Sequence, residues 1–148
     1  MKEQSKILII EDDVDLIEAM KITLEAEEYK VISATDPDDG FDKAKKEQPH
    51  LIILDVMFGE TKEKKGFDYA VKLKQEKALA SIPIMMITAV NVQHPTYHFS
   101  PETDGEYLPV DEFIDKPAQP EELTEKVKKL LEMKTSKWEN WPNKAHQR

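Results

Sequence analysis

The chain has 148 residues, the length of one ordinary globular domain. Its 30 acidic and 21 basic residues give a formal charge of −9 at pH 7, which disfavours nucleic acid as a partner. It has no cysteine, which excludes disulfides and thiolate catalysis, and no apolar run long enough to span a bilayer. Without a signal peptide at its start, we expect a cytoplasmic protein that binds neither membrane nor nucleic acid.

The first predicted strand is KILII at 6–10, a continuous apolar run typical of a strand buried on both faces of a parallel sheet. A helix is predicted over 14–27, because apolar residues recur there at helical spacing. The face expected to be buried consists of Val14, Ile17, Met20 and Leu24.

A shorter strand is predicted over 29–34 and a second helix over 36–47. Asp36 is expected to cap this helix, with Pro37 in its first turn. Its inward-facing residues are expected to be Phe41 and Ala44.

The run LIIL at 51–54 predicts a third strand, and 66–77 predicts a third helix. The apolar residues of this helix are Phe67, Ala70, Val71 and Leu73. Residues 59–65, between the strand and the helix, include three lysines, which either recruit an anionic partner or form a solvated loop.

A fourth strand is predicted over 82–88 and a fifth over 111–115. Residues 89–110 between them contain three prolines, one glycine and no apolar stripe, so we predict that the fourth helix is short or irregular. His94 and His98 do not indicate a zinc site, because no third ligand accompanies them. The strongest amphipathic stripe predicts a helix over 120–133, with Leu123, Val127, Leu130 and Leu131 inside.

Alternation of strands and helices predicts an α/β fold, a doubly wound five-stranded parallel sheet with helices on both faces. We divide the chain into one domain, residues 1–134, and a C-terminal tail, residues 135–148. Trp138 and Trp141 in the tail either anchor a partner or pack against the domain.

Polar side chains follow the predicted strands at their carboxyl ends, which is where open parallel sheets bind ligands. Clustered carboxylates repel one another unless a cation lies between them, and Mg²⁺ prefers oxygen ligands. A hydroxyl and an ammonium group can bind phosphoryl oxygens, and a carboxylate can accept a phosphoryl group. Asp13 is better explained as a helix cap. The other residues at this edge are Glu11, Asp12, Asp55, Thr88 and Lys116.

Four blocks in this order, ILIIEDD, LIILDVM, MMITA and FIDKP, resemble the receiver domain of two-component response regulators, which has the CheY-like, flavodoxin-like fold. The resemblance covers about residues 5–133. It implies that Asp55 accepts a phosphoryl group, with Thr88 and Lys116 completing the reaction centre. The Mg²⁺ ligands that it implies are Glu11, Asp12, Asp55 and the Met57 carbonyl. It implies phosphate contacts from Thr88, Ala89 and Lys116, and a conformational switch formed by Thr88 and Phe113.

The resemblance implies a signalling switch, not an enzyme. About fifteen residues follow the last predicted helix, too few for an effector domain, so we expect a stand-alone receiver domain. The phosphoryl donor would be a histidine kinase or a phosphotransfer protein, and another protein would read the modified state. The family often forms homodimers, so a homodimer is a further expectation. One alternative is a pseudo-receiver scaffold that is never phosphorylated. Another is a phosphohydrolase of the haloacid-dehalogenase type, which needs an acid two residues after the nucleophile, where this chain has Met57.

Overall fold

The structure, a computed structural model, describes residues 4–58, 65–88, 110–133, 135 and 136, and all structural statements below refer to them. Five strands form one sheet in the order β2-β1-β3-β4-β5, and every neighbouring pair is parallel. The strands are β1 (Lys6–Ile10), β2 (Lys30–Ala34), β3 (Leu51–Asp55), β4 (Ile84–Thr88) and β5 (Glu112–Asp115).

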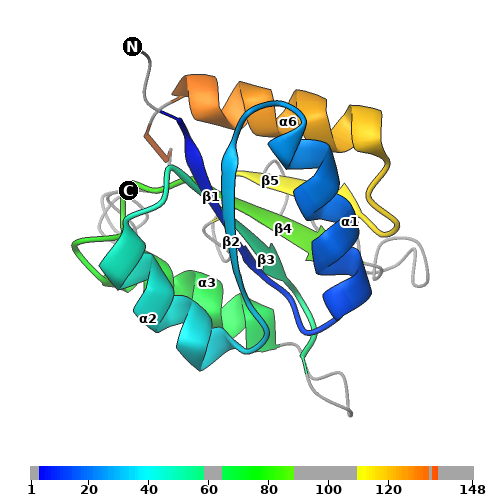
Figure 1. The fold of residues 1–148 in the computed structure, drawn as a ribbon. Helices are drawn as coiled ribbons and strands as arrows, with labels where there is room; N and C mark the ends of the chain where they lie inside the picture. Colours follow the sequence, from blue (N-terminus) through cyan, green and yellow to red (C-terminus); the bar gives the residue numbers. More distant parts are fainter. Residues whose placement is uncertain (1–3, 59–64, 89–109, 134, 137–148) are drawn as a thin grey trace.

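Helices cover both faces of the sheet (Figure 1), with α1 and α6 on one face and α2 and α3 on the other. They are α1 (Val14–Glu25), α2 (Pro37–Glu47), α3 (Lys65–Gln75) and α6 (Pro120–Met133). The predicted doubly wound, five-stranded parallel sheet is therefore confirmed. The short or irregular fourth helix was predicted in 89–110, almost all of which lies outside the described residues.

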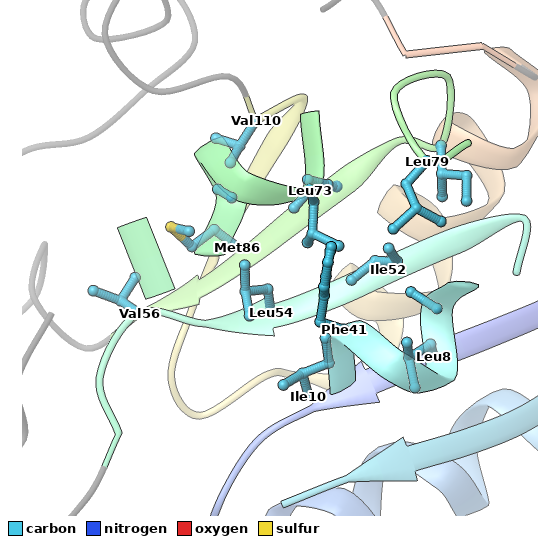
Figure 2. Packing of buried hydrophobic residues seen from close by; sticks show 14 of the residues in the cluster. Leu8, Ile10, Phe41, Ile52, Leu54, Val56, Leu73, Leu79, Met86 and Val110 are labelled. Atoms are coloured by element: carbon cyan, nitrogen blue, oxygen red, sulfur yellow. The ribbon is translucent and has the colours of Figure 1, made fainter. Parts of the chain in front are cut away.

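The core consists of two apolar layers, one on each face of the sheet. In β1, Leu8 and Ile10 pack toward α2 and α3, whereas Ile7 and Ile9 pack toward α1 and α6. Side chains alternate between the faces of a strand, so a strand covered on both faces must be apolar at every position. This is why β1, β3 and β4 contain continuous apolar runs, whereas the edge strands β2 and β5 do not. Figure 2 shows the layer beside α2 and α3.

Capping side chains start the first two helices. The Asp13 carboxylate accepts hydrogen bonds from the backbone N–H groups of Asp15 and Leu16, at 3.0 and 3.1 Å. Asp36 likewise accepts from Asp39 N–H at 2.9 Å, and Pro37 follows at the first helical position. The structure therefore confirms the helix-starting roles predicted for Asp13 and Asp36.

One predicted core residue of α1 is on the surface. Ile17, Met20 and Leu24 are buried, but Val14 is 62% exposed. At 100° per residue, Val14 lies roughly 90° from the centre of the stripe formed by the three buried residues, so it points along the flank of the helix. In α3, Ala70 and Leu73 are buried as predicted.

The chain remains in contact with the sheet after α6 ends at Met133. Ser136 is buried, and its backbone N–H donates a hydrogen bond to the Ser81 carbonyl at 2.7 Å. The division between a domain and a tail at residue 134 stays a prediction. Trp138 and Trp141 lie outside the described residues.

Candidate functional site

The predicted polar residues gather at the carboxyl edge of the sheet. Glu11 and Asp12 follow β1, Asp55 ends β3 and Thr88 ends β4. Because β1 and β4 are the two neighbours of β3, their ends flank Asp55 on both sides. Carboxylate oxygens of Glu11, Asp12 and Asp55 lie within 4.8 Å of one another. Sequence reasoning therefore predicted a cluster that the fold brings together.

Two of these carboxylates are almost completely buried. Glu11 and Asp55 are each 1% exposed, and Asp12 is partly buried beside them. The Asp55 Oδ2 atom is buried and accepts no hydrogen bond from any residue that the structure describes. Removing an ionised carboxylate from water is costly unless a charge or a donor compensates it. A cation bound between the carboxylates would supply that compensation, so this donor set fits a hard divalent ion such as Mg²⁺.

Lys116 lies between the two buried carboxylates. Its Nζ atom is 3.2 Å from Glu11 Oε1 and also 3.2 Å from Asp55 Oδ1. A backbone hydrogen bond from Lys116 N–H to the Thr88 carbonyl, 2.9 Å long, holds the chain at this point. Sequence reasoning placed Lys116 at this edge as a phosphate-binding residue but did not predict its ion pairs with the acids.

The charges of this cluster shift one another's proton affinity. Burial, and then the negative charge of Asp55, raise the pKa of Glu11 to about 8, although the Asp13 N–H and Lys116 partly oppose the rise. Burial lowers the pKa of Lys116, but Asp55 and Glu11 outweigh that effect, so its pKa is raised overall. Near neutral pH the metal-free cluster therefore holds a proton on Glu11 as well as the ammonium of Lys116.

Contacts of the end of β3 with α3 and β4 fix the position of Asp55. The Gly66 N–H donates to the Val56 carbonyl at 2.8 Å, and the Val56 N–H donates to the Ile87 carbonyl at 3.0 Å. A Cβ atom on Gly66 would lie only 2.0 Å from the Asp55 carbonyl oxygen. Only glycine therefore lets the start of α3 approach the end of β3 this closely.

The remaining predicted site residues occupy compatible positions, although their roles stay predictions. Thr88 is buried at the end of β4, and Met57 is half-buried against the core layer beside α2 and α3. Phe113 is buried in that same layer. Its carbonyl accepts a hydrogen bond from Lys126 Nζ of α6 at 2.6 Å. Ala89 lies outside the described residues.

No helix among the residues that the structure describes is long and apolar enough to cross a membrane. That finding agrees with the hydropathy of the sequence.

Curated relatives align with most of the chain. The chain is 32% identical over 126 residues to the alkaline phosphatase synthesis transcriptional regulatory protein PhoP of Bacillus subtilis. It is equally identical, over the same length, to the DNA-binding dual master transcriptional regulator RpaA of Synechocystis. Each alignment covers 85% of this chain and 48% of the relative, so the chain spans about half the length of these regulators.

Solved structures show the same fold. The chemotaxis response regulator CheY4 of Vibrio cholerae aligns with a TM-score of 0.71 at 24% identity, covering 86% of this chain and 99% of that one. The receiver domain of a Pseudomonas aeruginosa sensor histidine kinase aligns with a TM-score of 0.72 at 16% identity, covering 88% and 99%. That structure has a magnesium ion coordinated in its active-site cleft.

A family model assigns the chain more directly than any single relative. The model of the response regulator receiver domain matches residues 7–128, which include every site residue discussed above. Together with the parallel sheet and the acidic cluster at its carboxyl edge, this match shows that the chain belongs to the response regulator receiver domain family.

Proposed function

We propose that this receiver domain is a Mg²⁺-dependent phosphorylation switch in which Asp55 accepts the phosphoryl group. The observation that carries the proposal is the cluster of Glu11, Asp12 and Asp55, whose oxygens lie within 4.8 Å of one another. Asp55 is 1% exposed and has one oxygen atom without a hydrogen bond from the described residues. Such a group is available to bind a cation and to react.

The residues that would hold Mg²⁺ are Asp12, Asp55 and the Met57 carbonyl, with Glu11 acting through a water molecule. The bound ion would neutralise the phosphoryl oxygens and make phosphorus more open to attack. Because the pKa of Glu11 is raised to about 8, binding of a cation would release a proton from the cluster near neutral pH.

The chemical step transfers a phosphoryl group from a phosphohistidine of a histidine kinase or phosphotransfer protein. An Asp55 carboxylate oxygen attacks phosphorus and forms the new O–P bond. The N–P bond breaks, its electron pair stays on the imidazole nitrogen, and that nitrogen then takes a proton. Lys116, already 3.2 Å from Asp55 Oδ1, would pair with the transferred group, and the Thr88 hydroxyl would donate to one of its oxygens.

The acyl phosphate would be read by another protein. In this proposal Thr88 turns toward the phosphoryl group and the packing of Phe113 changes with it. The formal charge of −9 favours protein contacts over nucleic acid as the output of this chain. The DNA binding named for the relative RpaA belongs to that protein, of which this chain matches 48%.

Labelling with acetyl phosphate and Mg²⁺ tests the assignment of Asp55. Asp115 provides a matched control, because it also ends a strand of the sheet, β5, and is exposed. The wild-type protein and Asp115→Asn should acquire one acid-stable, base-labile phosphoryl group, whereas Asp55→Asn should acquire none. Labelling of Asp55→Asn at the full rate would contradict the assignment.

Beryllofluoride, a mimic of the phosphoryl group, distinguishes the switch from a scaffold. Mg²⁺-dependent binding of beryllofluoride to the wild type, lost in Asp55→Asn, is the expected result. No binding would favour the pseudo-receiver alternative. Steady release of phosphate from an ester substrate would instead favour a phosphohydrolase, which Met57 disfavours because its side chain cannot transfer a proton.

A further inference from the structure

A second buried polar cluster lies at the opposite edge of the sheet, where β4 and β5 begin. Asp111, directly before β5, is 4% exposed. Ser136, which follows the end of α6 at Met133, is 2% exposed. Figure 1 shows the short segment after α6 returning to the end of the sheet at which the strands start. Neither residue takes part in the chemistry proposed for Asp55.

Ser136 is bound through its side chain and its backbone. Its hydroxyl donates to the Asp111 carboxylate, with Oγ 2.9 Å from Oδ2 and 3.1 Å from Oδ1. Its N–H donates to the Ser81 carbonyl at 2.7 Å. The chain leaving α6 is therefore tied to two segments, the residues before β4 and the residue before β5.

Asp111 is itself held in place by the first residue of β4. The Asp111 N–H donates to the Ile84 carbonyl at 2.8 Å, and the Ile84 N–H donates to Asp111 Oδ2 at 3.0 Å. The carboxylate thus takes the position of a backbone carbonyl at the start of the β4–β5 ladder. A buried carboxylate needs such donors, because burying it without them is costly.

The chain just before β4 is also fixed from the other side. Lys74 of α3 is 2% exposed, and its Nζ donates to the carbonyls of Ala80, at 3.1 Å, and Ile82. Residues 80–84 are therefore bound to α3 on one side and to Asp111 and Ser136 on the other.

We propose that Asp111 and Ser136 form a latch that fixes the chain leaving α6 at the amino ends of β4 and β5. The latch opens locally, without unfolding the sheet, because it consists of hydrogen bonds at one edge of the sheet, whereas the strands are held by the whole core. Both tryptophans of the chain follow Ser136 in the sequence. The latch therefore fixes the position of the chain at residue 136, just before the segment that contains them.

Hydrogen exchange of the backbone amide at position 136, followed by NMR, tests the latch. Ser136→Ala removes the hydroxyl and should accelerate exchange at this amide by about tenfold or more, because hydrogen bonds to charged groups are among the strongest. Ser81→Ala is the matched control: Ser81 contributes its backbone carbonyl, so this variant should exchange like the wild type. The free energy of global unfolding should fall in Ser136→Ala by no more than the same tenfold factor, about 1.4 kcal/mol, and should change little in Ser81→Ala.

A double-mutant cycle shows whether Asp111 is the partner that matters. In an Asp111→Ala background, Ser136→Ala should cause no further acceleration at position 136. If Asp111→Ala does not fold, Asp111→Asn replaces it, and the effect of Ser136→Ala should then be reduced. Equal exchange at position 136 in Ser136→Ala and the wild type would overturn the latch. An unchanged effect of Ser136→Ala in the Asp111 background would overturn it too.

Discussion

Gly66→Ala is expected to damage both the stability of the domain and the reactivity of Asp55. The added Cβ atom would lie 2.0 Å from the Asp55 carbonyl oxygen, 2.7 Å from Val56 Cα and 2.8 Å from the Val56 carbonyl oxygen. All three are backbone atoms, so no side-chain rotation can relieve the contact. The start of α3 and the end of β3 must move apart.

The required movement sets the size of the effect. Cβ atoms in proteins essentially never approach a heavy atom closer than 3.0 Å, so the separation must grow by about 1 Å. Overpacking of this kind costs about 1–3 kcal/mol, and the better helix propensity of alanine offsets at most about 1 kcal/mol of that. A displacement of about 1 Å at a reacting group can slow a reaction by about 100-fold.

Gly40→Ala is the matched control. Its Cβ atom would meet the Ile10 side chain at 2.6 to 2.9 Å, which is a smaller overlap with no backbone atom among its three nearest contacts. Urea unfolding should therefore show a larger loss of free energy for Gly66→Ala than for Gly40→Ala. Acetyl phosphate should label Gly66→Ala about 100-fold more slowly than Gly40→Ala. Equal stability and equal labelling rates in the two variants would refute this account of Gly66.

Two further predictions concern the charges around Asp55. Because the pKa of Glu11 is raised from 4.5 to about 8 in the fold, the metal-free protein should lose stability as pH rises from 4.5 through 8. Glu11→Gln should abolish that loss, and parallel curves of unfolding free energy against pH for the two proteins would contradict it. Lys116→Met removes the cation 3.2 Å from both buried carboxylates and should cost roughly 1–3 kcal/mol at pH 8 without metal, because Lys116 is partly exposed. Exposed Lys129→Met is its control in urea unfolding, and equal stability of the two variants would show that the ion pairs contribute nothing.

The acidic site was predictable because its residues stand directly after apolar runs. A continuous apolar run indicates a strand covered on both faces, and parallel strands bring their carboxyl ends to one edge. The sequence alone therefore places Glu11, Asp55 and Thr88 together. This inference needs no knowledge of how the side chains pack.

The charge balance within the site was not predictable in the same way. Sequence reasoning assigned Lys116 to phosphate and left the repulsion among the acids to a metal ion. In the fold, Lys116 Nζ lies 3.2 Å from both Glu11 and Asp55. Which of several charges at one edge touch one another depends on side-chain directions and on how far the chain after β5 extends. Local sequence patterns contain neither.

By itself, the sequence determined which segments form strands and helices, which edge of the sheet carries the acids, and which capping residues start α1 and α2. These features depend on neighbours in the chain or on the alternation of a strand. The tertiary structure decided that Val14 is exposed, that Gly66 touches the backbone of Asp55, and that Ser136 binds Asp111. Each of these depends on the distance and angle between elements far apart in the chain, which are set by packing across the sheet and not by local periodicity.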